Sequence, residues 1–347
     1  MMRCSNCSFV WNADFQQDKI SYDDGYNNDV TYSGYYVAHL EKMADRIINS
    51  VPKDKPIHYV EVGCGEAGFL RLVVERANGR CKTAIGFDPS FTGEENLPEG
   101  AVVHKTFFGP EQVKLVPDET NIICSRHTIE HVPDVHSFVS ALAAPMTTEA
   151  RKLFIETPDA NWILKNTAFQ DFFYEHCSIY TPESMETILN EYGLESNTYA
   201  AYDGQYMWTE AKLSSKQSSP EIHIEQNLAA EYIEKSTSML DEWKRFIHER
   251  SQYGPIAVWG AASKGVTFTL LLSEMLKKDT GITCAIDLNE AKQDCFMPIS
   301  GTQIVSPKAA QNMGVATVII MNPNYADEIE SMTADMGWTP KIAILND

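Results

Sequence analysis

The sequence lacks any long apolar run. No uninterrupted apolar stretch approaches the roughly 20 residues that a membrane-spanning helix needs, and the opening string MMRCSNCSF has no apolar core of the kind found in secretory signals. Hydrophobic residues make up 44% of the chain and charged residues 22%, which is typical of globular proteins. We therefore expect a cytoplasmic protein that neither crosses nor binds a membrane.

Basic residues are also scarce. The 347 residues include 28 Lys and Arg but 48 Asp and Glu, which gives a formal net charge of −20. A nucleic-acid-binding surface must neutralise phosphates, so nucleic acid is not an expected partner. The composition is compatible with a small-molecule substrate, with a local basic pocket and with any oligomeric state.

Metal-binding cysteine pairs are incomplete. A closed zinc site needs four ligands, and two Cys-x-x-Cys pairs usually supply them. Here Cys4 and Cys7 form one pair, and no second pair follows within the first fifty residues. The other cysteines are scattered, which indicates reduced thiols and not a disulfide framework. We expect no bound metal.

What the chain does contain is a strand, a tight turn and a helix at residues 59–70, YVEVGCGEAGFL. Three glycines follow the pattern Gly63-x-Gly65-x-x-Gly68, which lets the backbone pass close to a ligand. The glycine spacing alone fits a nicotinamide dinucleotide and S-adenosylmethionine (SAM) equally well. An ordinary strand-to-helix turn without a ligand is the remaining alternative.

Two acidic residues favour SAM. Glu61 lies two residues before the first glycine, where a carboxylate would repel a pyrophosphate but attract the sulfonium and ammonium groups of SAM. Asp88 ends the next strand-like run and can accept both ribose hydroxyls. The residues that we expect to contact SAM are Glu61, Gly63, Cys64, Gly65, Gly68, Asp88, Pro89 and His127.

The hydrophobic pattern predicts an α/β protein with two units. Helical spacing occurs over 37–50 and 222–250, and a polar break covers 214–221. Strand-like runs alternate with helical or loop segments, which is typical of parallel sheets; they cover 58–62, 83–87, 101–105, 120–125 and 151–156, then 256–260, 282–287, 302–305, 315–321 and 341–345. The expected domains are an N-terminal segment, a SAM-binding domain, a linker with a long helix, and a second Rossmann-like domain, over 1–36, 37–213, 214–250 and 251–347.

The second unit opens with another strand-to-helix turn, Trp259 to Gly265. Backbone N–H groups at a helix N-terminus attract anions, and Lys264 would strengthen that attraction. Asp287 ends the following strand and could meet a ribose. A nucleotide fold used only for packing is the equal alternative.

Candidate catalytic groups occur in two clusters. One covers residues 126–134, RHTIEHVPD, directly after the fourth strand, and the other covers residues 172–180, FFYEHCSIY. Glu175 and His176 are adjacent, and in a loop both could face one cleft. A histidine can take a proton from a carbon that a neighbouring carbonyl acidifies. The alternative for each histidine is a structural role with hydrogen bonds to the backbone.

These strings resemble the SAM-dependent C-methyltransferases that methylate a carbon beside the keto group of nucleotide-linked deoxysugars. The resemblance covers nearly the whole chain and rests on CSNC, SYDDGYNN, VEVGCGEAGFL, HTIEHVPDV, FYEHCSIYT, GQYMWTEAK and the C-terminal VWGAASKG, IDLNEAKQ and PISGTQIVSP. It implies a class I methyltransferase domain with an appended C-terminal Rossmann-like domain. Family members carry two Cys-x-x-Cys pairs that hold zinc, whereas this chain shows one.

The resemblance also implies roles for individual residues. Glu175 and His176 would remove the carbon-bound proton, with His176 as the base, and His131 would polarise the keto oxygen. Tyr174, a further candidate catalytic residue, and either Tyr26 or Tyr32 would line the same pocket. Lys264, from the second strand-to-helix turn, is a further candidate for substrate binding. The alternatives are a SAM-dependent O- or N-methyltransferase, an NAD-dependent sugar enzyme, which Glu61 disfavours, and a non-catalytic protein that binds SAM or a nucleotide.

Overall fold

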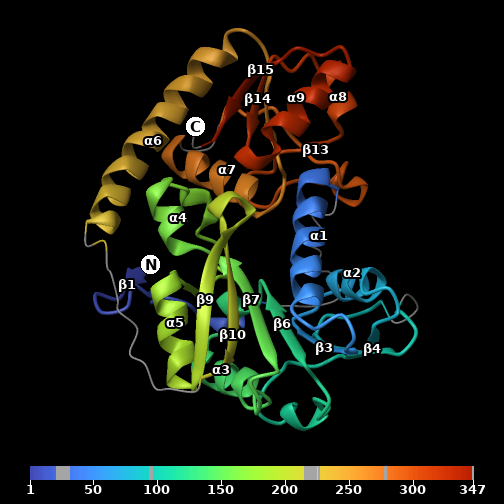
Figure 1. The fold of residues 1–347 in the computed structure, drawn as a ribbon. Helices are drawn as coiled ribbons and strands as arrows, with labels where there is room; N and C mark the ends of the chain where they lie inside the picture. The colour runs from blue at the N-terminus through green and yellow to red at the C-terminus, as the bar shows by residue number, and fades with distance from the viewer. Residues whose placement is uncertain (21–31, 94–96, 215–224, 226, 277–279, 346–347) are drawn as a thin grey trace. The chain divides into compact units, whose positions relative to one another are not determined.

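The computed structural model describes residues 1–20, 32–93, 97–214, 225, 227–276 and 280–345 (Figure 1). The chain forms two compact units, each assembled from several segments. The N-terminal unit comprises Met1–Asn27, His39–Trp162 and Tyr174–Gln226, and the C-terminal unit comprises Asn28–Ala38, Ile163–Phe173 and Asn227–Asp347. Tyr26 and the SYDDGYNN string lie outside the described residues.

A seven-stranded sheet forms the centre of the N-terminal unit, with the strand order β5-β4-β3-β6-β7-β10-β9. Figure 1 shows its strands from β4 on the right to β9 on the left. Strands β3 to β7 pair in parallel, and β10 pairs antiparallel with both β7 and β9. The strands are β3 (Ile57–Val62), β4 (Cys81–Phe87), β5 (Ala101–His104), β6 (Ile122–Arg126), β7 (Lys152–Pro158), β9 (Leu194–Ala201) and β10 (Tyr206–Leu213).

The five strands expected from the sequence are all present, but β9 and β10 were not predicted. Strand β9 is an edge strand with mostly polar, solvent-facing side chains, so it has no apolar run that would indicate a strand. Its connection to β10 is a short turn in which Asp203 and Gly204 adopt positive φ angles of 53° and 84°. The sheet is consequently mixed, with a parallel part that agrees with the predicted α/β class.

The strand order reverses at β3, which has β4 on one side and β6 on the other. In a parallel sheet, ligands bind at such a reversal, beyond the carboxyl ends of the strands. Residues 63–68 leave β3 at this end, and residues 127–131 leave β6 beside them. The topology therefore brings the glycine turn and the first histidine cluster together.

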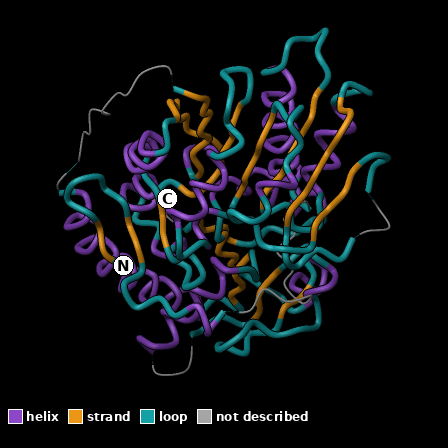
Figure 2. The backbone as a smooth tube through the Cα atoms, turned by 90° about the horizontal axis from the view of Figure 1, so that it is seen from below, coloured by secondary structure: helices purple, strands orange, loops and turns teal. Residues whose placement is uncertain are grey.

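Helices of the N-terminal unit present apolar faces to the sheet, and Figure 2 shows helices running along the strands. The buried residues of α2 are Phe69, Leu70 and Val73. Helix α5 begins at a capping box, in which Thr181 and Ser184 exchange hydrogen bonds. The helices are α2 (Gly68–Arg76), α3 (Val135–Ala143) and α5 (Pro182–Glu191), while α1 (Gly34–Asn49) and α4 (Ala160–Lys165) contribute residues to both units.

A small second sheet connects the N-terminus to the second histidine cluster. Strand β2 (Val10–Trp11) pairs with β1 (Met2–Arg3) and with β8 (Ser178–Ile179), all antiparallel. Cys4 and Cys7 lie in the β1–β2 turn, where the Asn6 N–H donates to Cys4 Sγ at 3.4 Å. All eight cysteines are described, and all are free thiols.

The C-terminal unit has a five-stranded, fully parallel sheet with the order β13-β12-β11-β14-β15, which confirms the predicted second Rossmann-like unit. Alternate residues of β11 belong to two different apolar clusters, so both faces of the sheet are covered. The elements are β11 (Ile256–Trp259), β12 (Cys284–Ile286), β13 (Ile304–Val305), β14 (Thr317–Ile320), β15 (Lys341–Ile344), α6 (Leu228–Ser251), α7 (Ser263–Leu276), α8 (Pro307–Asn312) and α9 (Ala326–Asp335).

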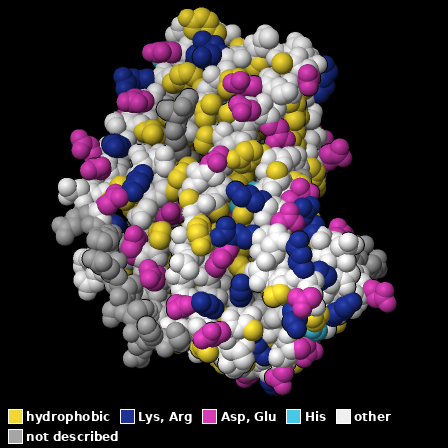
Figure 3. All heavy atoms as spheres, viewed as in Figure 1, with side chains coloured by type: hydrophobic (Ala, Val, Ile, Leu, Met, Phe, Trp, Pro, Cys, Tyr) yellow, Lys and Arg dark blue, Asp and Glu magenta, His cyan; other side chains and the backbone are white. Residues whose placement is uncertain are grey.

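Charged side chains of both signs lie on the surface (Figure 3). Acidic and basic side chains are intermingled on the face seen in Figure 3. Across the described residues, no helix combines the length and the apolar character that crossing a membrane requires.

We expect Gly265→Ala to destabilise the protein. A Cβ at Gly265 would lie 2.0 Å from the carbonyl oxygen of Gly260, a backbone atom at the end of β11, so the helix could not keep its contact with the strand. The expected cost is about 1–3 kcal/mol, measured by urea unfolding. Gly34→Ala, in the same unit and with nothing within 4 Å of the new Cβ, is the control and should unfold like the wild type. Equal midpoints for Gly265→Ala and wild type would show that the contact can relax.

Candidate active site

The glycine turn after β3 lies against the loop that follows β6. Gly63 and Gly65 have φ angles of 72° and 51°, which glycine adopts without strain. A Cβ at Gly63 would lie 1.9 Å from Thr128 Oγ1, so a side chain there would collide with the neighbouring loop. The turn is therefore bare backbone, and Gly68 starts helix α2 directly behind it.

Asp88 is held against this turn. Its Oδ2 accepts a hydrogen bond from the Gly65 N–H at 2.8 Å, and its Oδ1 accepts from the Ser90 N–H and hydroxyl at 2.9 and 2.6 Å. Cys64 is buried and Pro89 half-buried on either side. The carboxylate is fixed in place while two oxygens retain lone pairs, which is the arrangement needed to accept a pair of ribose hydroxyls.

Glu61 is a buried acid, and among the described residues it forms no ion pair. Its side chain accepts a hydrogen bond from the Tyr59 hydroxyl at 3.0 Å. Burial raises the pKa of Glu61 to about 7, although the positive charge of Arg126 opposes the shift. A bound cation would restore the ionised carboxylate. The bare turn, the fixed Asp88 and this acid together fit SAM, which carries an ammonium group and no phosphate.

A second buried carboxylate, Glu156, lies at the end of β7. It accepts hydrogen bonds from Arg126 Nε at 2.6 Å and from His39 Nε2 at 2.5 Å. Burial would raise the pKa of Glu156, but Arg126, His39 and His127 outweigh burial and hold it below its usual range. Glu156 therefore stays an anion and joins β6, β7 and helix α1.

His127 stands at the start of the loop after β6, with a left-handed φ angle of 48°. Its Nε2 lies 3.7 Å from Glu156, and its ring contacts the edge of Tyr206 at 4.5 Å between centroids. Tyr206 in turn stacks on Tyr202 at 4.8 Å. The strained backbone turns His127 toward this aromatic pair, and the side chain keeps part of its surface exposed.

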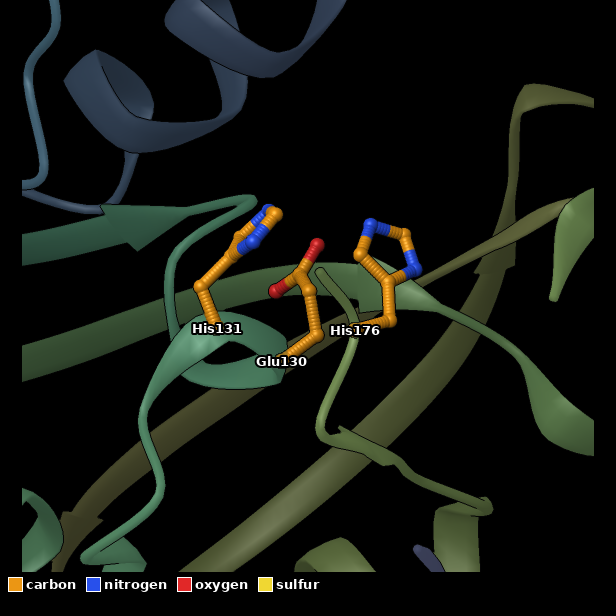
Figure 4. Close-up of side chains that lie close together, drawn as sticks. All are labelled: Glu130, His131 and His176. Carbon is orange, nitrogen blue, oxygen red and sulfur yellow. The ribbon is translucent and has the colours of Figure 1, made fainter. Parts of the chain in front are cut away.

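The structure brings the two predicted histidines together. The rings of His131 and His176 meet edge to face, with 4.8 Å between their centroids. His131 ends the short helix η4 (Ile129–His131), and His176 precedes β8. Figure 4 shows the carboxylate of Glu130 between the two rings. These residues come from segments 45 positions apart, so only the fold unites them.

The predicted Glu175–His176 pair is separated by the backbone. His176 is buried, whereas Tyr174 and Glu175 are exposed in the turn before it. The Tyr174 hydroxyl accepts a hydrogen bond from the Gln16 N–H at 3.0 Å, and its ring stacks on Phe15. The turn is thus tied to the N-terminal segment, and roles for Tyr174 and Glu175 stay predictions.

Two predicted substrate-binding residues, Tyr32 and Lys264, belong to the C-terminal unit. Tyr32 is exposed. Lys264, near the start of α7, forms an ion pair with Asp171 at 2.6 Å, so its charge is already balanced within the unit. The Ala261 N–H donates to Asp287 at 3.2 Å, which repeats the contact between Gly65 and Asp88. Substrate binding by Tyr32 and Lys264 stays a prediction.

One group of side chains has the composition of a metal site. Among the described residues, the possible ligand atoms of Glu130, His131 and His176 lie within 4.8 Å of one another. No bound metal is expected from the sequence, in which Glu130 is marked only as part of the string HTIEHVPDV. Glu156 and His39 carried no comparable signal, because each lies in an otherwise ordinary strand or helix.

We expect the affinity for SAM to depend on pH through Glu61. Positive charge on SAM favours the carboxylate, so binding below pH 7 must first expel the proton that the raised pKa retains. The ratio of wild-type to Glu61→Gln affinity should therefore grow about tenfold from pH 6 to pH 8, measured by calorimetry. Protonation of the SAM amino group affects both proteins equally, so the ratio cancels it. A constant ratio would refute this role of Glu61.

Comparisons with known proteins agree with this geometry. A family model described as a methyltransferase domain matches residues 36–198, and one described as a C-methyltransferase C-terminal domain matches residues 216–342. The chain is similar to the C-methyltransferase NovU of Streptomyces niveus, with 24% identity over 170 residues. That match covers 47% of this chain and only 38% of the relative.

Similar solved structures include RosA, an N,N-8-amino-8-demethyl-D-riboflavin dimethyltransferase from Streptomyces davawensis, at 16% identity and a TM-score of 0.42 over 52% of this chain and 56% of that one. The carbon methyltransferase CurJ gives 13% identity and a TM-score of 0.42 over 53% and 56%. Both TM-scores are below 0.5, so the assignment rests on the two family models, the topology and the site. The chain therefore combines a methyltransferase domain, over residues 36–198, with a C-methyltransferase C-terminal domain, over residues 216–342.

Proposed function

We propose that the protein methylates a carbon next to a ketone, with a nucleotide-linked deoxysugar as its substrate. The observation that carries the proposal is the His131–His176 pair, which lies in the same unit as the glycine turn. Residues 127–131 leave the strand next to that turn, and Thr128 contacts Gly63 directly. A base and a methyl-donor site are thereby built into the same end of one sheet.

Methylation at carbon needs a base, because the carbon-bound proton must leave. In the proposed reaction a ring nitrogen of His176 takes that proton, since the ketone acidifies the neighbouring carbon. The electron pair of the broken C–H bond forms an enolate, and His131 stabilises the charge on its oxygen. When bound, SAM supplies an electrophilic methyl group for the carbon.

His176 differs in burial from Glu175 and Tyr174, and we assign their roles accordingly. His176 is shielded from water and stands beside His131, which suits proton transfer in a site that excludes solvent. Glu175 and Tyr174 are exposed on the same turn, so they are proposed to contact the substrate from its outer side. The proposal of a sugar nucleotide rests on the resemblance, which covers nearly the whole chain.

The direct test is methyl transfer to a defined ketone. Thymidine diphosphate 4-keto-6-deoxyglucose is the probe, and thymidine diphosphate glucose, which has no ketone, is its control. We expect the keto sugar, and not its control, to raise the melting temperature in the presence of S-adenosylhomocysteine and to gain a methyl group from SAM. Methylation of both compounds would favour an O-methyltransferase.

His176→Ala should lower the rate of methyl transfer by about 10²–10⁴-fold, because that is the range that general-base catalysis contributes. The dissociation constant of SAM should stay within about twofold of wild type, since His176 is not among the residues assigned to SAM. His136→Ala, on the exposed start of helix α3, is the control and should be fully active. Wild-type turnover in His176→Ala would show that His176 is not the base.

Asp88→Ala should weaken SAM binding by at least about tenfold, because charge-assisted hydrogen bonds of this kind contribute roughly 1.5–3 kcal/mol each. The matched control is Asp287→Ala, which removes the equivalent acid of the C-terminal unit. Calorimetry with SAM should give an unchanged affinity for the control. If both variants bind SAM like wild type, the ribose assignment of Asp88 fails.

A further inference from the structure

We infer that Glu130 is the positioning residue of the histidine pair: its buried carboxylate fixes the orientation and the protonated ring nitrogen of His131 and His176. The sequence predicts Glu175, and not Glu130, as the acidic partner of His176. The importance of Glu130 for catalysis rests on the proposed function, whereas its effect on the two rings does not.

The position of Glu130 is set by a hydrogen bond to one of its two carboxylate oxygens. The side chain is completely buried. Oε2 accepts a hydrogen bond from the Thr157 hydroxyl on β7 at 3.0 Å. Oε1 lies 3.5 Å from His127 Nδ1 and accepts no hydrogen bond among the described residues. The carboxylate is therefore held from one side, and one oxygen is left with no hydrogen-bond donor.

The backbone ties Glu130 to the segment that carries His176. The Cys177 thiol donates to the carbonyl oxygen of Glu130 at 3.4 Å. The Cys177 carbonyl accepts from the Asn12 N–H at 2.9 Å, so the N-terminal hairpin supports the same segment. Small helix η4 and strand β8 consequently keep a fixed distance, which places His176 beside Glu130 (Figure 4).

The negative charge of Glu130 affects the protonation of the neighbouring histidine rings. A buried anion needs a positive partner, and the nearby Arg126 already pairs with Glu156. Burial would raise the pKa of Glu130, but His127, His131 and His176 lower it to about 2, so it is ionised at neutral pH. A carboxylate beside an imidazole favours the form with its N–H toward the oxygen, and it stabilises the imidazolium that forms when the ring takes a proton.

A divalent cation is the competing occupant, because two imidazoles and a carboxylate are a familiar set of ligands. The contacts favour positioning: Thr157 occupies one oxygen of Glu130, and His127 approaches the other. A metal ion would have to displace the second contact. The two readings predict different metal contents for the purified protein.

The test uses full-length protein labelled with ¹⁵N-histidine, and its NMR signals are assigned with His131→Gln and His176→Gln variants. Ring-nitrogen shifts report which nitrogen carries the proton. At pH 7.5, Glu130→Gln should change the shifts of His131 and His176, and Glu130→Asp should restore them in part. Glu191→Gln, on the exposed end of α5, is the control and should leave them unchanged. Unchanged shifts in Glu130→Gln would overturn the inference.

Activity and metal content complete the test. With the keto-sugar probe, Glu130→Gln should lower kcat by about 10–100-fold, with KM and the SAM affinity within about twofold of wild type. If wild type does not methylate the probe but the shifts change, the proposed function fails and the positioning role stands. One equivalent of zinc or another transition metal in wild type, lost in Glu130→Gln, would overturn positioning in favour of a metal site.

Discussion

Buried negative charge at one end of the N-terminal sheet is the constraint on which the site depends. Glu61, Glu130 and Glu156 follow or end three neighbouring strands, and all three are shielded from water. The buried charge of each carboxylate is balanced in a different way. Arg126 forms an ion pair with Glu156, and histidines surround Glu130. The pKa of Glu61 is raised by burial, and a bound cation would lower it. These charges hold the loops after β3, β6 and β7 in one arrangement, at an energetic cost that apolar packing of the sheet offsets.

The N-terminal hairpin supports the segment that carries His176, although the two are far apart in the sequence. Strand β2 pairs with β8, and β8 begins two residues after His176. The hairpin that contains Cys4 and Cys7 therefore supports the segment that must hold a histidine beside a buried carboxylate. The C-terminal unit repeats the strand, turn and acid of the cofactor site, with Asp287 in place of Asp88, but it has no acid in the place of Glu61.

Sequence patterns predicted the parts of the fold that depend on local periodicity. Ten apolar runs became strands because β-branched and aliphatic residues gather where both faces of a sheet are buried. Strands β9 and β10 were not predicted. Strand β9 lies at an edge and exposes polar side chains, so it has no apolar run that would indicate a strand. The motifs located Glu61, Asp88, His131 and His176, but burial decides their partners. The position of Glu130 beside His176 (Figure 4) depends on the pairing of β8 with the N-terminal hairpin, which no local sequence pattern indicates. The exposure of Glu175 likewise shows only in the structure.

We propose that a proton leaves the substrate carbon before the methyl group is transferred to it. This proposal is tested most directly with the keto-sugar probe carrying deuterium on the carbons beside the ketone, incubated with the protein and SAM and examined by mass spectrometry and NMR. The account predicts a product with a new carbon-bound methyl group and one deuterium fewer on the methylated carbon. A methylated product that retains all its deuterium would contradict the account, because the methyl group would then have gone to oxygen or nitrogen.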